Sequence, residues 1–210
     1  GKVLGGSSSI NGMLYVRGQP LDYDTWAQLG NRGWSYDEVL PFFRQSENFE
    51  RGRDQFRGSG GELNVADMVE HHPLLDAFIE AGVEIGYPKT PDYNGVSQEG
   101  FGYYQVTQLR GRRHSTADAF LRPARHRKNL HITTRAHVHR IVLDDNRAVG
   151  IRYSVAGQAR EARANREVLL CAGAVQSPQL LELSGIGNPE LLRKYDIDIA
   201  HELPGVGENY

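Results

Sequence analysis

The first twelve residues of this chain combine glycines with small polar side chains, a combination that suits a flat, polar ligand carrying phosphate. Gly5 and Gly6 can adopt positive φ angles and let the backbone approach a ligand closely. Ser7 to Ser9 offer hydroxyl groups, and Asn11 offers both a donor and an acceptor. Successive backbone N–H groups in such a turn also form a concave anion site. A flexible linker rich in glycine and serine is the competing interpretation.

Histidines and one cysteine are the other candidates for chemistry. His71 and His72 are neighbours, but a pair of histidines is too few ligands to define a metal site, and we expect none. His114 stands at the entrance of a predicted helix and could act as a base, but no nucleophile is evident and a structural role explains it better. Cys171 is the only cysteine, which excludes an intrachain disulfide and favours a reducing compartment. A structural role is therefore the favoured interpretation of these histidines.

The composition is that of an ordinary globular protein with a small net charge of −2. With 39% hydrophobic and 24% charged residues, the chain can bury a sizeable core in one or two domains. No apolar run is long enough to span a bilayer, and the first residues lack a signal-peptide pattern, so we expect a cytoplasmic protein. Peripheral association of the intact protein with the inner membrane stays open. Residues 110–128 carry a basic cluster without interleaved aromatic groups, so we expect a solvated face and no nucleic-acid partner.

Capping signals and apolar spacing predict the helices of the chain. Ser35 with Glu38 three residues later forms a capping box, and the helix that it opens contains Pro41, which should kink or restart it. Ser115 opens another helix in the same way. Helices are expected over residues 21–29, 35–46, 73–85, 115–121, 176–183 and 189–195. Apolar residues repeat at helical spacing within 73–85, so we expect this helix to be part of the core.

Loops and strands fill the stretches between these helices. Residues 52–61 are rich in glycine and arginine without periodicity, which predicts a mobile surface loop, either a lid over a site or a plain connector. Period-two alternation predicts strands over residues 62–65, 101–109, 130–134, 137–143, 148–155 and 159–165. Three of the last four should form an antiparallel meander. Residues 167–171 are continuously apolar, which is typical of a buried parallel strand that delivers a ligand-contacting turn at Ala172 and Gly173.

Two sequence signatures stand far apart in the chain. The first is Gly1-Lys-x-Leu-Gly-Gly-Ser-Ser-x-Ile-Asn11, and the second is Gly173-Ala-x-x-Ser-Pro-x-Leu-Leu-x-x-Ser-Gly-Ile-Gly187. Together they resemble the two fingerprints of the glucose-methanol-choline (GMC) flavoprotein oxidoreductases, and the resemblance covers essentially the whole chain. Residues 95–102, 111–121 and 203–209 are similar to the branch of choline dehydrogenases and aliphatic-alcohol dehydrogenases.

The resemblance implies that the chain is an internal fragment of a longer protein. In the family, a dinucleotide-binding unit precedes this region, and a catalytic histidine with a His or Asn partner follows it. The implied fold is mixed α/β, part of a FAD-binding domain with an antiparallel meander, intertwined with part of the substrate-binding subdomain. Residues 1–30 would form the FAD-contacting loop and helix, 31–125 mainly the substrate-binding subdomain with lid-like loops, and 126–210 the rest of the FAD-binding domain.

The cofactor that the resemblance implies is FAD. Some family members attach FAD covalently through a histidine, and Ile10 stands at the matching position here, so we expect noncovalent FAD. Asn11 to Leu14 would lie near the isoalloxazine ring, and the backbone of Val138 would contact adenine. The residues expected at the cofactor are Gly5, Gly6, Ser7, Asn11, Gly12, Met13, Leu14, Val138, Ala172 and Gly173.

The reaction implied for the intact protein is oxidation of a primary alcohol, choline-like or aliphatic, to the aldehyde by hydride transfer to flavin N5. The partners would be a small-molecule alcohol and an electron acceptor, either a quinone or O2, and the fragment alone should be inactive. One alternative is a binding or scaffold module that keeps the fold without the chemistry. Another is an NAD enzyme, which the chain supports poorly because no strand precedes its glycine-rich loop.

Overall fold

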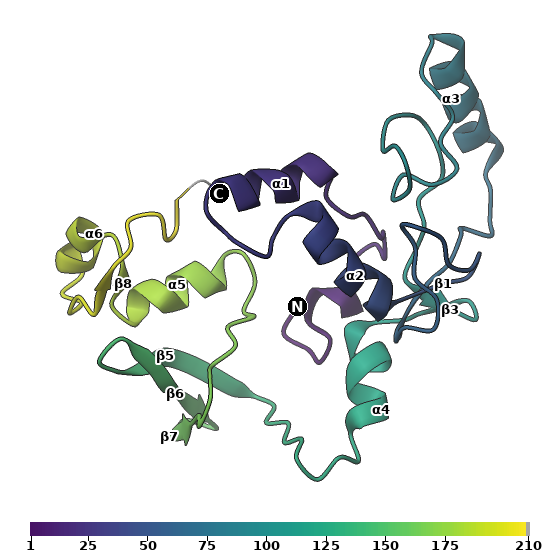
Figure 1. The fold of residues 1–210 in the computed structure, drawn as a ribbon. Coiled ribbons are helices and arrows are strands. Elements are labelled where there is room, and N and C mark those ends of the chain that lie inside the picture. Colours follow the sequence, from purple (N-terminus) through teal and green to yellow (C-terminus); the bar gives the residue numbers. More distant parts are fainter. Residues whose placement is uncertain (209–210) are drawn as a thin grey trace. The chain divides into compact units, whose positions relative to one another are not determined.

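The computed structural model describes residues 1–208 and divides the chain into two compact units, Gly1–Leu130 and His131–Tyr210 (Figure 1). Both units combine helices with small sheets, so the predicted mixed α/β class is confirmed. The two units follow one another along the chain, and the intertwining of cofactor and substrate subdomains stays a prediction. The opening segment stays with the middle of the chain because Leu14 forms a β-bridge with Val106. Asn209, the end of the third family-like segment, lies outside the described residues, as does Tyr210.

Short elements make up the first unit. They are η1 (Gly6–Ser9), α1 (Pro20–Gln28), α2 (Tyr36–Ser46), β1 (Glu47–Phe49), β2 (Leu63–Val65), α3 (Pro73–Glu84), β3 (Gln108–Leu109), β4 (Arg112–Arg113), the π-helical turn η2 (Ala117–Leu121) and α4 (Arg122–Ala124). Strand β1 pairs with β2 in parallel, and β3 pairs with β4 antiparallel. These small sheets bring the end of α2 beside the residues that follow the opening loop.

The predicted capping box of α2 is confirmed. The Ser35 backbone N–H donates to the Glu38 carboxylate at 3.1 Å, and the Ser35 hydroxyl donates to the same oxygen at 2.6 Å. Pro41 lies inside the helix, which continues through it to Ser46 rather than restarting. On the inner side, Tyr23 of α1 is buried against the ring of Phe43, with ring centroids 5.6 Å apart. Aromatic packing therefore holds α1 against α2.

Helix α3 forms where the sequence predicts it, but its expected place in the core is wrong. Among its residues only Ile79 and Gly82 are buried, whereas Leu74 and Phe78 are 72% and 64% exposed. The helix rests on a single narrow face, because a Cβ at Gly82 would lie 2.6 Å from the Phe101 ring. Helical spacing of apolar residues identifies the helix, but it does not reveal what covers each face.

The predicted strand over residues 101–109 is mostly absent. Only Gln108–Leu109 belongs to a sheet, and Phe101 and Val106 form isolated bridges instead. Val106 bridges both Leu14 and Ala66, so one residue joins two separate neighbours rather than one long partner. A continuous ladder needs a continuous partner, and alternation in the sequence cannot show that the partners are short.

The second unit contains the expected antiparallel meander. Its elements are β5 (Ala136–Asp144), β6 (Arg147–Val155), β7 (Gln158–Arg163), α5 (Gln176–Leu183), β8 (Ile186–Gly187), α6 (Pro189–Lys194) and β9 (His201–Glu202). The strand order is β5-β6-β7, with antiparallel pairing at both steps, and β8 pairs with β9 in parallel. The backbone N–H of Ile141 donates to the Ser184 hydroxyl at 2.8 Å, which joins β5 to the end of α5.

Two predicted strands of this unit do not form. Residues 130–134 are irregular, and so are residues 167–171, where Leu169 is 77% exposed instead of buried. Each strand needs a neighbour that shares its hydrogen bonds, and no strand among residues 1–208 pairs with either segment. Alternation in residues 130–134 and apolar composition in residues 167–171 therefore predicted strands that the structure does not contain.

Candidate cofactor-binding site

The opening loop has the backbone that its glycines predict. Gly5 and Gly6 have φ angles of +85° and +55° and lead into the 3-10 turn η1. At Gly5 a Cβ would lie 2.5 Å from the Ser9 hydroxyl oxygen, so packing as well as φ requires glycine there. At Gly6 a Cβ would meet no atom within 4 Å. The outer side of Gly6 is thus open for a ligand to approach the backbone.

Hydrogen bonds fix the inner side of this loop. The Thr116 backbone N–H donates to the Ser8 hydroxyl oxygen at 3.0 Å, and Arg113 Nη1 donates to the Ser8 carbonyl at 3.0 Å. The Thr116 hydroxyl also donates to the Gly5 carbonyl at 3.2 Å. These contacts argue against a flexible linker. The Ser7 side chain is exposed and has no hydrogen-bond partner among residues 1–208.

Asn11 presents its amide nitrogen outward. Its Oδ1 accepts hydrogen bonds from the Met13 backbone N–H at 3.0 Å and from Arg113 Nη1 at 2.9 Å. Both partners are donors only, so the side-chain oxygen must face them and Nδ2 must face away. No residue in the described part of the chain accepts from Nδ2. Asn11 therefore offers an oriented N–H donor at the loop surface.

The end of the loop is held in an unusual conformation. Met13 has a φ of +66°, which is uncommon for a residue with a side chain. Its carbonyl accepts the Thr107 backbone N–H at 2.8 Å, and the next residue, Leu14, pairs with Val106. Gly12 has only one atom, a side-chain carbon of Leu14, within 4 Å of a Cβ position. The seven residues expected at the cofactor from this stretch, Gly5 through Leu14, thus share one ordered loop.

The other three expected residues lie in the second unit. Val138 is half-buried on β5, opposite Tyr153 of β6. Ala172 and Gly173 form an exposed turn before α5, where the Ala172 N–H donates to the Ser177 hydroxyl at 3.1 Å. Gly173 has a φ of +93° and open space at its Cβ position. These features permit close approach by a ligand, and contact with the cofactor stays a prediction for all three.

A buried ionic cluster follows the loop, and sequence patterns missed it. Glu47 is fully buried: its Oε2 accepts Arg17 Nη2 and the Gly58 N–H, each at 2.8 Å, and its Oε1 lies 3.0 Å from Arg57 Nη2. Arg57 is also fully buried, and its Nη1 reaches Asp92 at 3.2 Å. The predicted surface loop over residues 52–61 is therefore wrong at its centre. We call Arg17, Glu47, Arg57 and Asp92 the buried anchor.

Charge balance and aromatic rings stabilise the buried anchor. Two guanidinium groups meet two carboxylates, and the Arg57 guanidinium lies 3.8 Å from the centroid of the Phe49 ring. Burial lowers the pKa of Arg57, while Glu47 and Asp92 oppose that change. Because an arginine starts from a very high pKa, the group stays charged at neutral pH. The charges of Arg17, Glu47 and Arg57 therefore need each other, since these three side chains are almost completely shielded from water.

Two tyrosines beside the anchor, the buried Tyr93 and the half-buried Tyr15, have structural hydrogen-bonding roles rather than roles as acids or bases. Burial raises the pKa of Tyr93 to about 12, and burial also raises the pKa of Tyr15. The Tyr93 hydroxyl donates to the Tyr15 carbonyl at 2.9 Å. A phenol with a raised pKa stays protonated near neutral pH and so is not available to take up a proton. Neither tyrosine is therefore a candidate general base.

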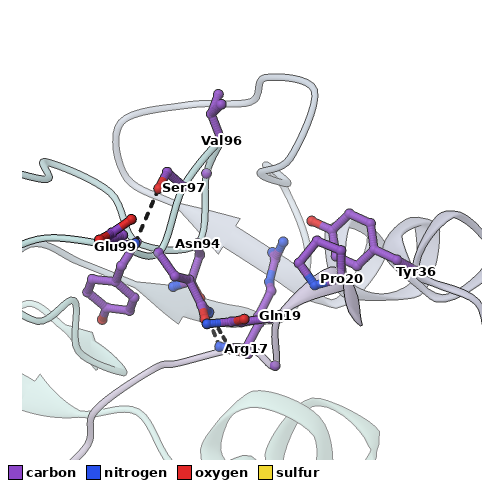
Figure 2. Close-up of a pocket in the computed structure, with 12 residues that line it drawn as sticks. Arg17, Gln19, Pro20, Tyr36, Asn94, Val96, Ser97 and Glu99 are labelled. Atoms are coloured by element: carbon purple, nitrogen blue, oxygen red, sulfur yellow. Dashed lines mark hydrogen bonds between the residues drawn. The ribbon is translucent and has the colours of Figure 1, made fainter. Parts of the chain in front are cut away.

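A small cavity lies on the other side of Arg17. Figure 2 shows it between the segment that begins at Arg17 and a loop that carries Val96 and Ser97, with a dashed hydrogen bond joining Arg17 to Asn94. Its volume is about 260 Å³. A second cavity of about 430 Å³ lies beside α3, with Tyr103 and Glu80 among its lining residues. Neither cavity contains a residue of the cofactor loop.

The histidines singled out in the sequence have structural contacts. His114 Nδ1 accepts the Asn64 backbone N–H at 3.1 Å, which ties it to β2. His72 Nδ1 accepts the Leu74 N–H at 3.2 Å and so caps α3, while His71 stacks on Tyr103 with ring centroids 4.1 Å apart. Among residues 1–208 no three His, Cys, Asp or Glu side chains gather as a metal site would require. In the same part of the chain, every helix is too short or too polar to cross a membrane.

The mixed α/β fold and the open glycine-rich loop suit a domain that holds a large polar cofactor. The chain belongs to the GMC oxidoreductase family, whose sequence profile matches residues 1–210. The matched domain is the FAD-binding domain of these enzymes, so FAD is confirmed as the cofactor at the level of the family. Which residues touch it is a separate question.

Curated relatives and solved structures agree with this family. The chain is 50% identical to an oxygen-dependent choline dehydrogenase of Photobacterium profundum and 51% identical to one of Chromohalobacter salexigens, over its whole length in both cases. It covers only 37% and 38% of those two proteins. The crystal structure of a pyridoxine 4-oxidase from Mesorbium loti superposes with a TM-score of 0.87 at 36% identity, over 94% of this chain and 39% of that one.

Proposed function

We propose that the intact protein is an FAD-dependent oxidoreductase that oxidises a primary alcohol, choline-like or aliphatic, to the aldehyde. The observation that carries this proposal is the match of half of all residues to choline dehydrogenases across the whole chain. The ordered loop at Gly5 to Leu14 supports it, because an open backbone and an oriented donor suit a large polar cofactor. The chain spans less than two-fifths of those relatives, so the activity belongs to the longer protein.

The chain's own residues would bind and orient the cofactor. Bound FAD would accept the hydride of the alcohol at its N5. Gly6 would let the backbone approach it, the exposed hydroxyl of Ser7 would donate or accept a hydrogen bond, and Nδ2 of Asn11 would donate one. Met13 and Leu14, at the fixed end of the loop, would limit water on one side. No residue in the described part of the chain is proposed to move a proton.

Binding would be noncovalent. Ile10 is 66% exposed at the end of η1. Family members that attach FAD covalently carry a histidine at the matching position. An aliphatic side chain has no nucleophilic atom for a bond to the flavin ring. The loop would therefore hold FAD by hydrogen bonds and contacts alone, and denaturation should release the flavin into solution.

The domain division would follow the same logic. Residues 1–30 and 126–210 would serve the cofactor, and residues 31–125 would serve mainly the substrate. The ordered glycine-rich loop within residues 1–30 supports the first part of this division, because its open backbone suits a cofactor. The substrate would be a small alcohol, and the electron acceptor would be either O2 or a quinone.

The test is a titration of the full-length protein that contains this chain. We expect a flavin absorption band that choline or an aliphatic primary alcohol bleaches in the absence of O2, and that O2 or a quinone restores. Asn11→Ala should weaken FAD binding about tenfold, the effect of removing one donor of about 1.4 kcal/mol. Asn146→Ala, at an exposed turn of the meander, is the matched control and should bind as the unchanged protein does.

Three outcomes would count against the proposed function, and a fourth would count only against the role of Asn11. A protein without any flavin would contradict the FAD assignment, and binding of NAD in its place would favour the competing enzyme class. A flavin that no alcohol reduces would favour a binding module without chemistry. Equal losses in the two asparagine variants would remove Asn11 from the site while leaving the cofactor in place.

A further inference from the structure

The buried anchor begins three residues after the cofactor-binding loop. Arg17, its first member, is 5% exposed, and Glu47 and Arg57 are fully buried. Burying a charged side chain costs desolvation free energy. Such side chains are therefore found in the interior where ion pairs and hydrogen bonds offset that cost or where their geometry is needed. The described contacts connect the anchor to the loop along two routes.

The first route runs through Gln105. Its side-chain oxygen accepts Arg57 Nη1 at 3.3 Å, and its backbone carbonyl accepts the Tyr15 N–H at 3.0 Å. Two residues further on, the Thr107 N–H holds the Met13 carbonyl at 2.8 Å. Gln105 is 1% exposed, so water does not compete for these bonds. The position of Arg57 therefore fixes the short segment against which the loop ends.

The second route runs through Asn94. Its Oδ1 accepts the Arg17 backbone N–H at 2.8 Å, and its Nδ2 donates to the Tyr15 carbonyl at 3.0 Å. The Arg17 side chain donates from Nη1 to the Phe56 carbonyl at 2.7 Å and from Nη2 to Glu47. The Arg17 side chain thus connects the Glu47 carboxylate to two backbone segments. One is its own segment, residues 15–17, and the other is the segment at Phe56.

We propose that Glu47 is a positioning residue for the cofactor-binding loop. By holding Arg17 and Arg57 it keeps residues 15–17 and 105–107 in place, and so maintains the left-handed conformation of Met13 and the outward direction of Asn11. The inference rests on the proposed FAD function of that loop. With Glu47 neutralised, Arg17 would have no carboxylate partner among residues 1–208, and Arg57 would keep only Asp92, whose side chain is 17% exposed. They would draw toward water and loosen both segments.

The test compares two glutamates in the full-length protein. Glu47→Gln removes the buried charge with almost no change of shape. Glu161→Gln is the matched control, because Glu161 also lies between two arginines, Arg152 and Arg163, but on the surface of β7. The readouts are amide hydrogen exchange of residues 11–18, with α5 as an internal reference, and the affinity of the apo-protein for FAD in a fluorescence titration.

For Glu47→Gln we expect exchange of residues 11–18 to rise and FAD affinity to fall about tenfold, the scale on which a supporting partner acts on a bound group. Helix α5 should exchange as before, and Glu161→Gln should change neither readout. A purely structural role would speed exchange of residues 11–18 no more than that of the rest of the first unit, or would change neither readout. Tight FAD binding by a folded Glu47→Gln protein would overturn the inference.

A second variant keeps the test decisive where Glu47→Gln yields no folded protein. Arg57→Lys retains the buried positive charge but cannot reach Glu47, Asp92 and Gln105 together, because an ammonium is a point donor on a flexible stem. The same local rise in exchange and the same loss of affinity are expected. Absence of flavin from the unchanged protein would count against the proposed function. Flavin bound equally by all variants would count against the positioning role alone.

Discussion

Two glutamates of this chain lie between two arginines, and their surroundings differ. Glu47 is fully buried between Arg17 and Arg57, and it also accepts the backbone N–H of Gly58. Glu161 lies on β7 with 32% of its side chain exposed, 3.3 Å from Arg152 and 2.6 Å from Arg163. Each glutamate therefore has two arginine partners within 3.3 Å, but only Glu161 is exposed to water.

The comparison teaches that burial, not the number of contacts, decides what such a cluster does. At the surface, water and salt replace a lost partner at little cost. In the interior, loss of one partner leaves the other charge without compensation. The buried anchor therefore holds separate chain segments in fixed positions. The surface cluster of Glu161, Arg152 and Arg163 lies on a solvent-exposed strand and does not have that role. The four predictions that follow test this difference.

The largest effect is expected for Glu47→Gln. Removing this carboxylate should lower the free energy of unfolding by about 3–5 kcal/mol, the usual range when one partner of a buried ion pair is lost. Urea denaturation of the full-length protein, followed by circular dichroism, measures it. A loss below about 1 kcal/mol, the range of a surface pair, would show that burial does not set the value of this cluster.

Gly58→Ala tests the backbone that brings Arg57 to the carboxylate. The Gly58 N–H donates to Glu47, and a Cβ there would lie 1.8 Å from the Arg44 carbonyl oxygen. Backbone cannot yield as a side chain does, so we expect a loss of about 1–3 kcal/mol in stability. Gly205→Ala, with open space and no positive φ, is the control and should be neutral. Thermal unfolding of both variants makes the comparison.

Asp67→Asn probes an intermediate case. Asp67 accepts two hydrogen bonds from Arg51, at 2.5 and 2.6 Å, with both side chains 44% exposed. The Asp67 hydrogen bond is the main reason that the pKa of Arg51 is raised. Because water screens the pair, we expect a loss of only about 0.2–1 kcal/mol, reduced further by salt. A loss as large as that of Glu47→Gln would mean that geometry outweighs burial.

The parts of the fold that sequence predicted are those that short stretches decide. Ser35 and Glu38 stand three residues apart, and their capping box forms within a single turn. Hairpin turns likewise join β5, β6 and β7, so alternation and turn residues suffice to define the meander. The opening loop was predictable for the same reason, since Gly5 and Gly6 set its backbone locally.

The parts that sequence missed depend on distant neighbours. Glu47 and Arg57 meet only because β1 pairs with β2, and no spacing rule links a glutamate to an arginine across such a loop. The apolar run around Leu169 predicts a buried strand, but the residue is exposed. A strand forms only where a neighbouring strand shares its backbone hydrogen bonds. The apolar residues flanking a charge, as Phe49 flanks this cluster, were the one available signal, and they are too common to be diagnostic.

The smallest effect is expected for Glu161→Gln, and its pH dependence is the sharpest contrast with the buried site. The hydrogen bond from Arg152 is the main cause that holds the pKa of Glu161 below its usual range, and the charge of Arg163 acts in the same direction. A lowered folded pKa stabilises the protein above the unfolded value of about 4.3 and stops doing so as the pH falls through the folded pKa. Any difference in melting temperature between Glu161→Gln and the unchanged protein should therefore be slight at about pH 7 and vanish once the pH has fallen below the folded pKa of Glu161. It should also shrink in salt, because exposed charges are screened. A melting-temperature loss that matches Glu47→Gln at neutral pH, or that persists in acid, would show that the surface cluster carries a structural role of its own.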